Sequence, residues 1–164
     1  MLLLTGCSAA DNLIENAVGE AVEQGVESAT GAEVESGEDG FSVTTEDGEF
    51  SIGSDGTLPE GFPEAEVPVV EGDIIQTAKV ADGTADGYLV TVSVEGALDD
   101  VHADALGRLE GAGFTVAADV DLEEMRSTSL EGAGDVEAVT LGVIANSGDG
   151  TCTVSYTVAM AGAQ

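Results

Sequence analysis

Basic residues are nearly absent from this chain of 164 residues, which has three Lys and Arg against 33 Asp and Glu and a single His, for a formal net charge of −30. Nucleic-acid binding needs Lys and Arg to displace the counterions of the phosphates, so nucleic acid is excluded as a partner. The same charge repels an anionic membrane surface. One histidine also rules out any metal site built on two imidazoles.

Aromatic residues are scarce as well, at 4% with no Trp. This argues against a stacking platform for carbohydrate and against a large apolar ligand cavity. The chain has no G-x-S-x-G motif, phosphate loop or dinucleotide fingerprint. Pairs of carboxylates are uninformative among 33 acids. We therefore expect neither an enzyme nor a cofactor.

Long apolar runs are missing too, and the N-terminus holds only three leucines before Cys7. The sequence Leu4-Thr5-Gly6-Cys7 resembles the lipobox of bacterial lipoproteins. The resemblance implies that Cys7 carries fatty acyl chains, that the leader is cut before it, and that the protein is anchored on the extracytoplasmic face of the cell membrane. Two acyl chains suffice for stable anchoring. A signal peptide normally has about 7 to 15 apolar residues, so we expect residues 1–6 to be a truncated remnant whose true start lies upstream.

Cysteine is limited to Cys7 and Cys152. A disulfide between them is the alternative for a secreted protein. The lipobox accounts better for Cys7, and an acylated Cys7 could not form this bond. Cys152 falls on the apolar face of the last predicted strand, which favours a buried cysteine that acts as a small hydrophobic residue.

Residues 7–57 read as an acidic stalk. Apolar residues recur in it every four positions, which predicts a helix with a narrow apolar stripe: Ile14, Val18, Val22 and Val26, with Leu13, Ala17 and Ala21 beside them. Gly19 and Gly25 weaken this helix by about 1 kcal/mol each, so it is marginal unless it docks on something. A short self-associating coil is the alternative to a simple tether.

The stalk also contains a hairpin signal over residues 38–56, with Asp47-Gly48 between two alternating runs. An isolated hairpin is marginal in water, so its strands either pack on the main domain or stay loose. Three prolines then predict a stiff connector over residues 58–68, with Phe62 able to insert into the domain surface. The acidic stalk, the hairpin and the sequence P-E-G-F-P-E-A-E-V-P together resemble small uncharacterised lipoproteins of actinobacteria, which implies no activity.

Residues 69–164 predict an α+β domain, with a single antiparallel sheet of about five strands and one helix packed on a face. The expected order is a hairpin over residues 73–95, a helix that starts at Ala97 and ends at Gly111 or Gly113, a strand from Phe114 and a hairpin over 137–160. Residues 121–135 form either an edge strand or a loop. In the strands, alternation assigns the valine-rich faces to the core.

A weak metal candidate lies in the first hairpin of this domain, where Asp82, Thr84 and Asp86 match the start of a calcium loop. Ser93 stands where the completing glutamate is required, so a polar turn is the favoured interpretation. A looser hypothesis gathers weakly bound divalent cations at acids from several turns: Asp47, Glu49, Asp55 and Asp149. His102 is interpreted as an ordinary helix residue.

These observations favour a monomeric, lipid-anchored envelope protein with a non-catalytic binding or structural role. The expected partner is an unidentified protein, which would bind to the sheet surface or to an exposed strand edge. A calcium-responsive surface module is the alternative, and an enzyme is the least favoured.

Overall fold

The computed structural model describes residues 33–37, 40–45, 48–81, 86–132, 134–146, 148 and 150–162. These residues form nine strands and one helix, in this order along the chain: β1 (Glu33–Gly37), β2 (Gly40–Thr45), β3 (Gly48–Gly53), β4 (Asp73–Ala81), β5 (Asp86–Glu95), α2 (Leu98–Gly111), β6 (Thr115–Leu122), β7 (Met125–Glu131), β8 (Val136–Ala145) and β9 (Thr151–Met160).

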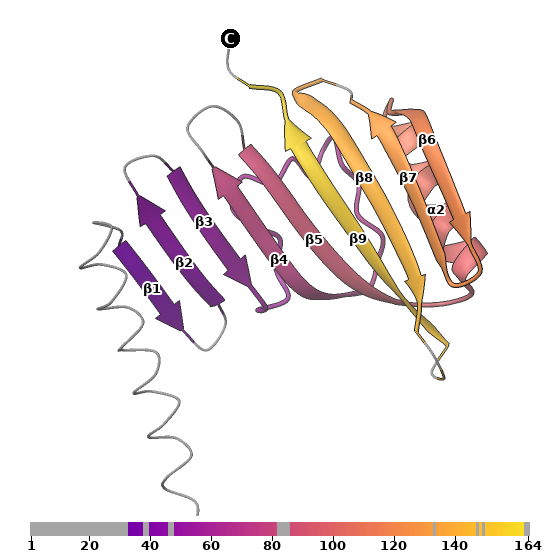
Figure 1. Cartoon of the computed structure of the whole chain (residues 1–164), viewed down its shortest axis with the longest axis horizontal. Helices are drawn as coiled ribbons and strands as arrows, with labels where there is room; N and C mark the ends of the chain where they lie inside the picture. The colour runs from indigo at the N-terminus through magenta and orange to yellow at the C-terminus, as the bar shows by residue number, and fades with distance from the viewer. Residues whose placement is uncertain are drawn as a thin grey trace, which may run out of the picture.

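All nine strands belong to one antiparallel sheet with the order β1-β2-β3-β4-β5-β9-β8-β7-β6. The first five strands follow one another as a meander. Helix α2 then carries the chain from β5 to the far edge, where β6 begins a second meander that returns until β9 pairs with β5 (Figure 1). The predicted α+β class with an antiparallel sheet and a helix on one face is therefore confirmed.

The expected number of strands, about five, was wrong. The residues assigned to the stalk supply β1, β2 and β3, and β3 pairs with β4 from Glu49 opposite Ala81 to Gly53 opposite Thr77. The hairpin was expected either to pack on the main domain or to stay loose, and its pairing with β4 shows that it packs on the domain. The boundary expected near residue 57 thus does not separate the sheet from the residues before it.

Residues 121–135 were also only partly anticipated. Strand β7 lies inside the sheet between β6 and β8, and the edge is β6. Glu123 and Glu124 form the tight turn between β6 and β7, where Leu122 pairs with Met125. The two acids obscure the strand pattern because they interrupt the apolar alternation.

Helix α2 agrees with its prediction. Val101, Ala105 and Leu109 are buried, while Asp99 and Asp100 occupy the first turn, where acids interact favourably with the helix dipole. The helix packs on β7, β8 and β9.

The core lies between this helix and one face of the sheet, called here the covered face. It is built from alternate residues of the strands, as the valine pattern predicted: Tyr88, Val90 and Val92 of β5, Leu130 of β7, Val136, Val139, Leu141 and Val143 of β8, and Cys152, Val154, Tyr156 and Val158 of β9.

Residues 54–72, called here the crossover segment, join β3 to β4 and cover part of this face beside the helix, over β5 and β9. Val67 and Val70 are buried in the core cluster, and the backbone N–H of Val70 donates to Tyr156 Oη at 3.2 Å. Phe62 packs edge-on against Tyr88 with ring centroids 5.7 Å apart. The insertion expected of Phe62 is confirmed, but the proline-rich residues cover the core and do not link a stalk to a domain.

Candidate functional site

The face of the sheet opposite α2, called here the uncovered face, has its apolar residues at its two ends. Directly paired residues of antiparallel strands share a face, so the register assigns each side chain. Phe50 pairs with Val80 and Ile52 with Ala78, and Val80 and Ala78 pair in turn with Gly87 and Leu89. These last two alternate with the buried Tyr88 and Val90, so the whole set lies on the uncovered face.

One end of this face carries the β2–β4 patch, defined by Phe41, Val43, Phe50, Ile52, Ala78 and Val80. Phe50 is 37% exposed and Val80 is 48% exposed, and the other four are half-buried. The patch therefore points away from the core of the same sheet.

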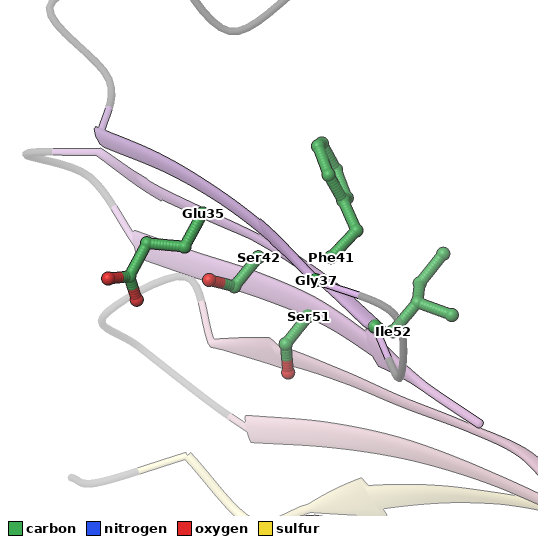
Figure 2. Close-up of a pocket in the computed structure, with 7 residues that line it drawn as sticks. Glu35, Gly37, Phe41, Ser42, Ser51 and Ile52 are labelled. Carbon is green, nitrogen blue, oxygen red and sulfur yellow. The ribbon is translucent and has the colours of Figure 1, made fainter. Parts of the chain in front are cut away.

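Figure 2 shows this polarity in the first three strands. Phe41 and Ile52 project from one side of the ribbon, while the oxygens of Glu35, Ser42 and Ser51 project from the other. A shallow hollow of about 370 Å³ lies here, lined by Glu35, Gly37, Gly40, Phe41, Ser42, Ser51 and Ile52. Its polar groups come from the opposite side of the sheet to its apolar groups and do not converge on one point.

The other end carries the β6–β8 corner, defined by Val120, Leu122, Met125 and Ile144. Leu122 pairs with Met125, which pairs with Ile144, so three of the four are neighbours in one row across the strands. Leu122 is 53% exposed and Ile144 is 47% exposed. Exposed Glu123 and Glu124 in the adjoining turn flank the corner with negative charge.

Between the two ends the uncovered face consists mainly of hydroxyl side chains. Thr91 of β5 pairs with Ser155, and Ser93 with Thr153. Ser155 donates to the carbonyl of Gly142 at 3.4 Å. A Cβ on Gly142 would stand 2.7 Å from Ser155 Oγ, so the glycine lets the hydroxyl lie across the sheet.

A polar network ties the helix to β6 and β7 on the covered side. His102 Nε2 lies 2.9 Å from Thr128 Oγ1, which donates to Asp119 Oδ1 at 2.7 Å. Thr128 has one hydroxyl proton and gives it to Asp119, so His102 donates to Thr128 and cannot act as its base. Thr128 is also fully buried. These three residues therefore have a structural role. The sequence alone did not reveal their contacts, because they lie on three different elements.

Arg126 extends the network with ion pairs of 2.7 Å to both Asp99 and Asp121. Its guanidinium also donates to the carbonyls of Leu122 and Met125. One of only three basic residues in the chain thus fastens the β6–β7 turn to the start of α2.

Only some of the residues singled out from the sequence lie in the part of the chain that the structure describes. Cys7, Asp82, Thr84, Asp47 and Asp149 lie outside the described residues. Asp86 begins β5 and pairs with Ala81, and Glu49 lies near the start of β3. Within the described ranges, no group of three or more His, Cys, Asp or Glu side chains is arranged to hold a metal ion.

Two of these candidates have local structural roles. Asp55 accepts from the hydroxyl and the backbone N–H of Thr57, and these bonds, the hydroxyl first, lower the pKa of Asp55. Cys152 is buried in β9, where its thiol lies 3.5 Å from the carbonyl oxygen of Gly96. Burial is consistent with the expected role of Cys152 as a small hydrophobic residue.

No protein-family model, curated protein or solved structure matches this chain. In the part that the structure describes, no helix has both the length and the apolar character needed to cross a bilayer. The functional conclusion therefore rests on the geometry of the uncovered face.

Proposed function

We propose that the protein is a non-catalytic binding protein of the cell envelope, anchored by acyl chains on Cys7 at the extracytoplasmic face of the membrane. It binds a protein partner through the β6–β8 corner. The observation that carries the binding role is the row of exposed Leu122, half-buried Met125 and exposed Ile144 beside a surface of hydroxyl side chains. Contiguous exposed apolar residues with a polar surround mark interaction sites on soluble domains.

Charge defines the kind of partner. The chain carries a net charge of −30, and Glu123 and Glu124 stand beside the corner. A complementary surface has an apolar centre and a rim of Lys and Arg, which would speed the encounter and exclude acidic competitors.

The anchor is tested by producing the chain behind a complete lipoprotein signal peptide. Intact mass should show acylation of Cys7, and the protein should fractionate with membranes. Cys7→Ser should release it into the soluble extracytoplasmic fraction. An unmodified Cys7 thiol on membrane-associated protein would contradict the anchor.

The binding role is tested in intact cells with a photoreactive side chain at position 144, and with the same group at exposed Thr57 in the crossover segment as the control. We expect one defined crosslinked protein from position 144 alone, lost when Leu122→Asp is added. Leu122 is half exposed, so this variant should keep its circular dichroism spectrum. Equal products from both positions, or none from 144, would refute binding at the corner.

A further inference from the structure

The β2–β4 patch is an apolar surface about as wide as one helix. It crosses three adjacent strands, which at about 4.8 Å per strand makes it roughly 10 Å wide. An α-helix with its side chains has a diameter of about 10 to 12 Å. The two paired rows, Phe41–Ile52–Ala78–Leu89 and Val43–Phe50–Val80–Gly87, contain no charged residue. Both described covering elements, α2 and the crossover segment, lie on the other face (Figure 1).

The chain itself supplies a matching surface just before β1. In residues 13–26, Ile14, Val18, Val22 and Val26 recur every four positions of a helix, Glu20 and Glu23 lie outside the arc of this stripe, and Glu15 falls within it. Gly19 and Gly25 make this helix weak in isolation, so it needs a surface to pack on.

The connection is short enough to hold the two surfaces together. Residues 27–32 separate the segment from β1, and at about 3.4 Å per residue they reach up to about 20 Å. Strand β1 is adjacent to β2, which carries one side of the patch. A segment tethered at this distance has an effective concentration in the millimolar range.

Other occupants are less well matched. Two copies of the chain would each bring a charge of −30, which opposes self-association. A basic partner would gain no ion pairs inside the two paired rows, since neither contains a carboxylate.

We infer that residues 13–26 form an amphipathic helix whose Ile14-Val18-Val22-Val26 stripe packs on the β2–β4 patch. The sheet then carries a helix on each face, α2 on β7–β9 and this one on β2–β4. One consequence rests on the proposed function. Only residues 8–12 would separate an acylated Cys7 from the docked helix, so the sheet would lie within about 20 Å of the bilayer and not at the end of a long stalk.

The test uses amide hydrogen exchange on the full chain carrying Cys7→Ser, so that its outcome does not depend on the lipid. Amides of residues 14–26 should exchange at least about tenfold more slowly than in an unfolded peptide. Val18→Asp with Val22→Asp should abolish this protection and speed exchange in β2 and β3. The matched control, Asn16→Asp with Gln24→Glu, adds the same charge on the polar side and should leave both unchanged.

An engineered disulfide tests which side of the helix faces the patch. Val22→Cys with Val80→Cys should crosslink under mild oxidation, whereas Glu20→Cys with Val80→Cys should not. Unprotected amides in residues 14–26, or protection that survives the double Asp variant, would overturn the inference. A dimer in sedimentation equilibrium whose dissociation removes the protection would also overturn it, in favour of a second copy. Failure of Cys7 acylation would remove only the position near the bilayer.

Discussion

The two halves of the sheet point their apolar side chains in opposite directions. In β5 and β7–β9 most of the apolar residues face α2 and the crossover segment, with Val90, Leu141 and Val154 fully buried. In β2 and β3 they face the other way, and Phe50 remains partly exposed. One continuous sheet thus presents two apolar surfaces on opposite sides.

A β-bulge in β4 accounts for the change of side. Ile74 pairs with Val92 and Gln76 with Thr91, so Ile75 is an extra residue in the strand. A shift of one residue moves every following side chain to the other face. Before the bulge Ile74 packs on the core, and after it Ala78 and Val80 lie on the uncovered face. Because Ile75 has no partner in β5, Ala78 and Val80 face the side opposite to Ile74, although all three are an even number of positions apart in the sequence.

Adding one residue directly after Ile75 should have the largest effect. The bulge accommodates one extra residue, so the pairing beyond the insertion would break or slip by one position. A slip would turn Ala78 and Val80 toward the covered face and leave Phe50 and Ile52 without their partners, and we expect the free energy of unfolding to fall by about 3 kcal/mol or more. Urea denaturation followed by circular dichroism measures this. Ile75→Thr keeps the extra residue at an exposed site and should cost no more than about 0.5 kcal/mol. Equal costs for the two variants would rule out the bulge as the switch.

Raising the pH above about 10 should lower the free energy of unfolding through Tyr156, which is buried on the covered face. Burial raises the pKa of Tyr156 to about 12, despite the hydrogen bond from Val70 that lowers it. The folded pKa lies above the unfolded one, so the contribution of Tyr156 is constant up to about pH 10. It is then lost between pH 10 and 12, by roughly 2 to 3 kcal/mol. Urea denaturation across this range should show the decline.

Tyr156→Phe serves as the control for the pH effect. It should remove this part of the pH dependence. It should also cost about 1 to 3 kcal/mol at neutral pH, because the backbone N–H of Val70 loses its acceptor. An unaltered decline in the variant would assign the effect to other groups.

The same substitution of one valine in the core and one in the β2–β4 patch compares how much each surface contributes to the free energy of unfolding. Val154→Ala in the core should cost about 2 kcal/mol, and Val43→Ala in the β2–β4 patch about 1 kcal/mol. If residues 13–26 dock there, the cost of Val43→Ala should fall when Val18→Asp and Val22→Asp are present, while that of Val154→Ala stays the same. Absence of this coupling would mean that Val43 does not touch the segment.

The smallest effect is expected at the ion pairs of Arg126. Asp99 is 78% exposed and Arg126 keeps its second partner, Asp121. Asp99→Asn should therefore change the free energy of unfolding by less than about 0.5 kcal/mol. A larger loss would show that the turn between β6 and β7 depends on this contact with α2.

Most elements after residue 69 could be predicted because their patterns are local. Helix α2 shows the spacing of three, four and four that links Leu98, Val101, Ala105 and Leu109, and β9 alternates along its whole length. The β2–β3 hairpin was also predictable, but its attachment to β4 was not, because strand pairing between distant segments leaves no periodic signal.

The face of the sheet on which each side chain lies was harder to predict than the helix and strands themselves. Ile74, Gln76, Ala78 and Val80 are each two positions apart, so the sequence alone would place them on one face. The bulge instead puts Ile74 on the covered face and the other three on the uncovered face. The burial of Phe62 could be suggested from its apolar character, whereas the hydrogen bond between Val70 and Tyr156 joins residues 86 positions apart and has no sequence signature. The β6–β8 corner was missed because Leu122 and Ile144 meet only through the strand order.

Among the described residues the sheet is open, and its strand order ends at β1 and β6 (Figure 1). An open edge is a template for strands of another copy, so such a sheet can polymerise through its backbone. Here mutual repulsion between highly acidic molecules opposes that route. The protection vanishes near the isoelectric point of about 4.1. The composition that limits the choice of partners thus also acts as a colloidal barrier, and an acidic environment would remove it.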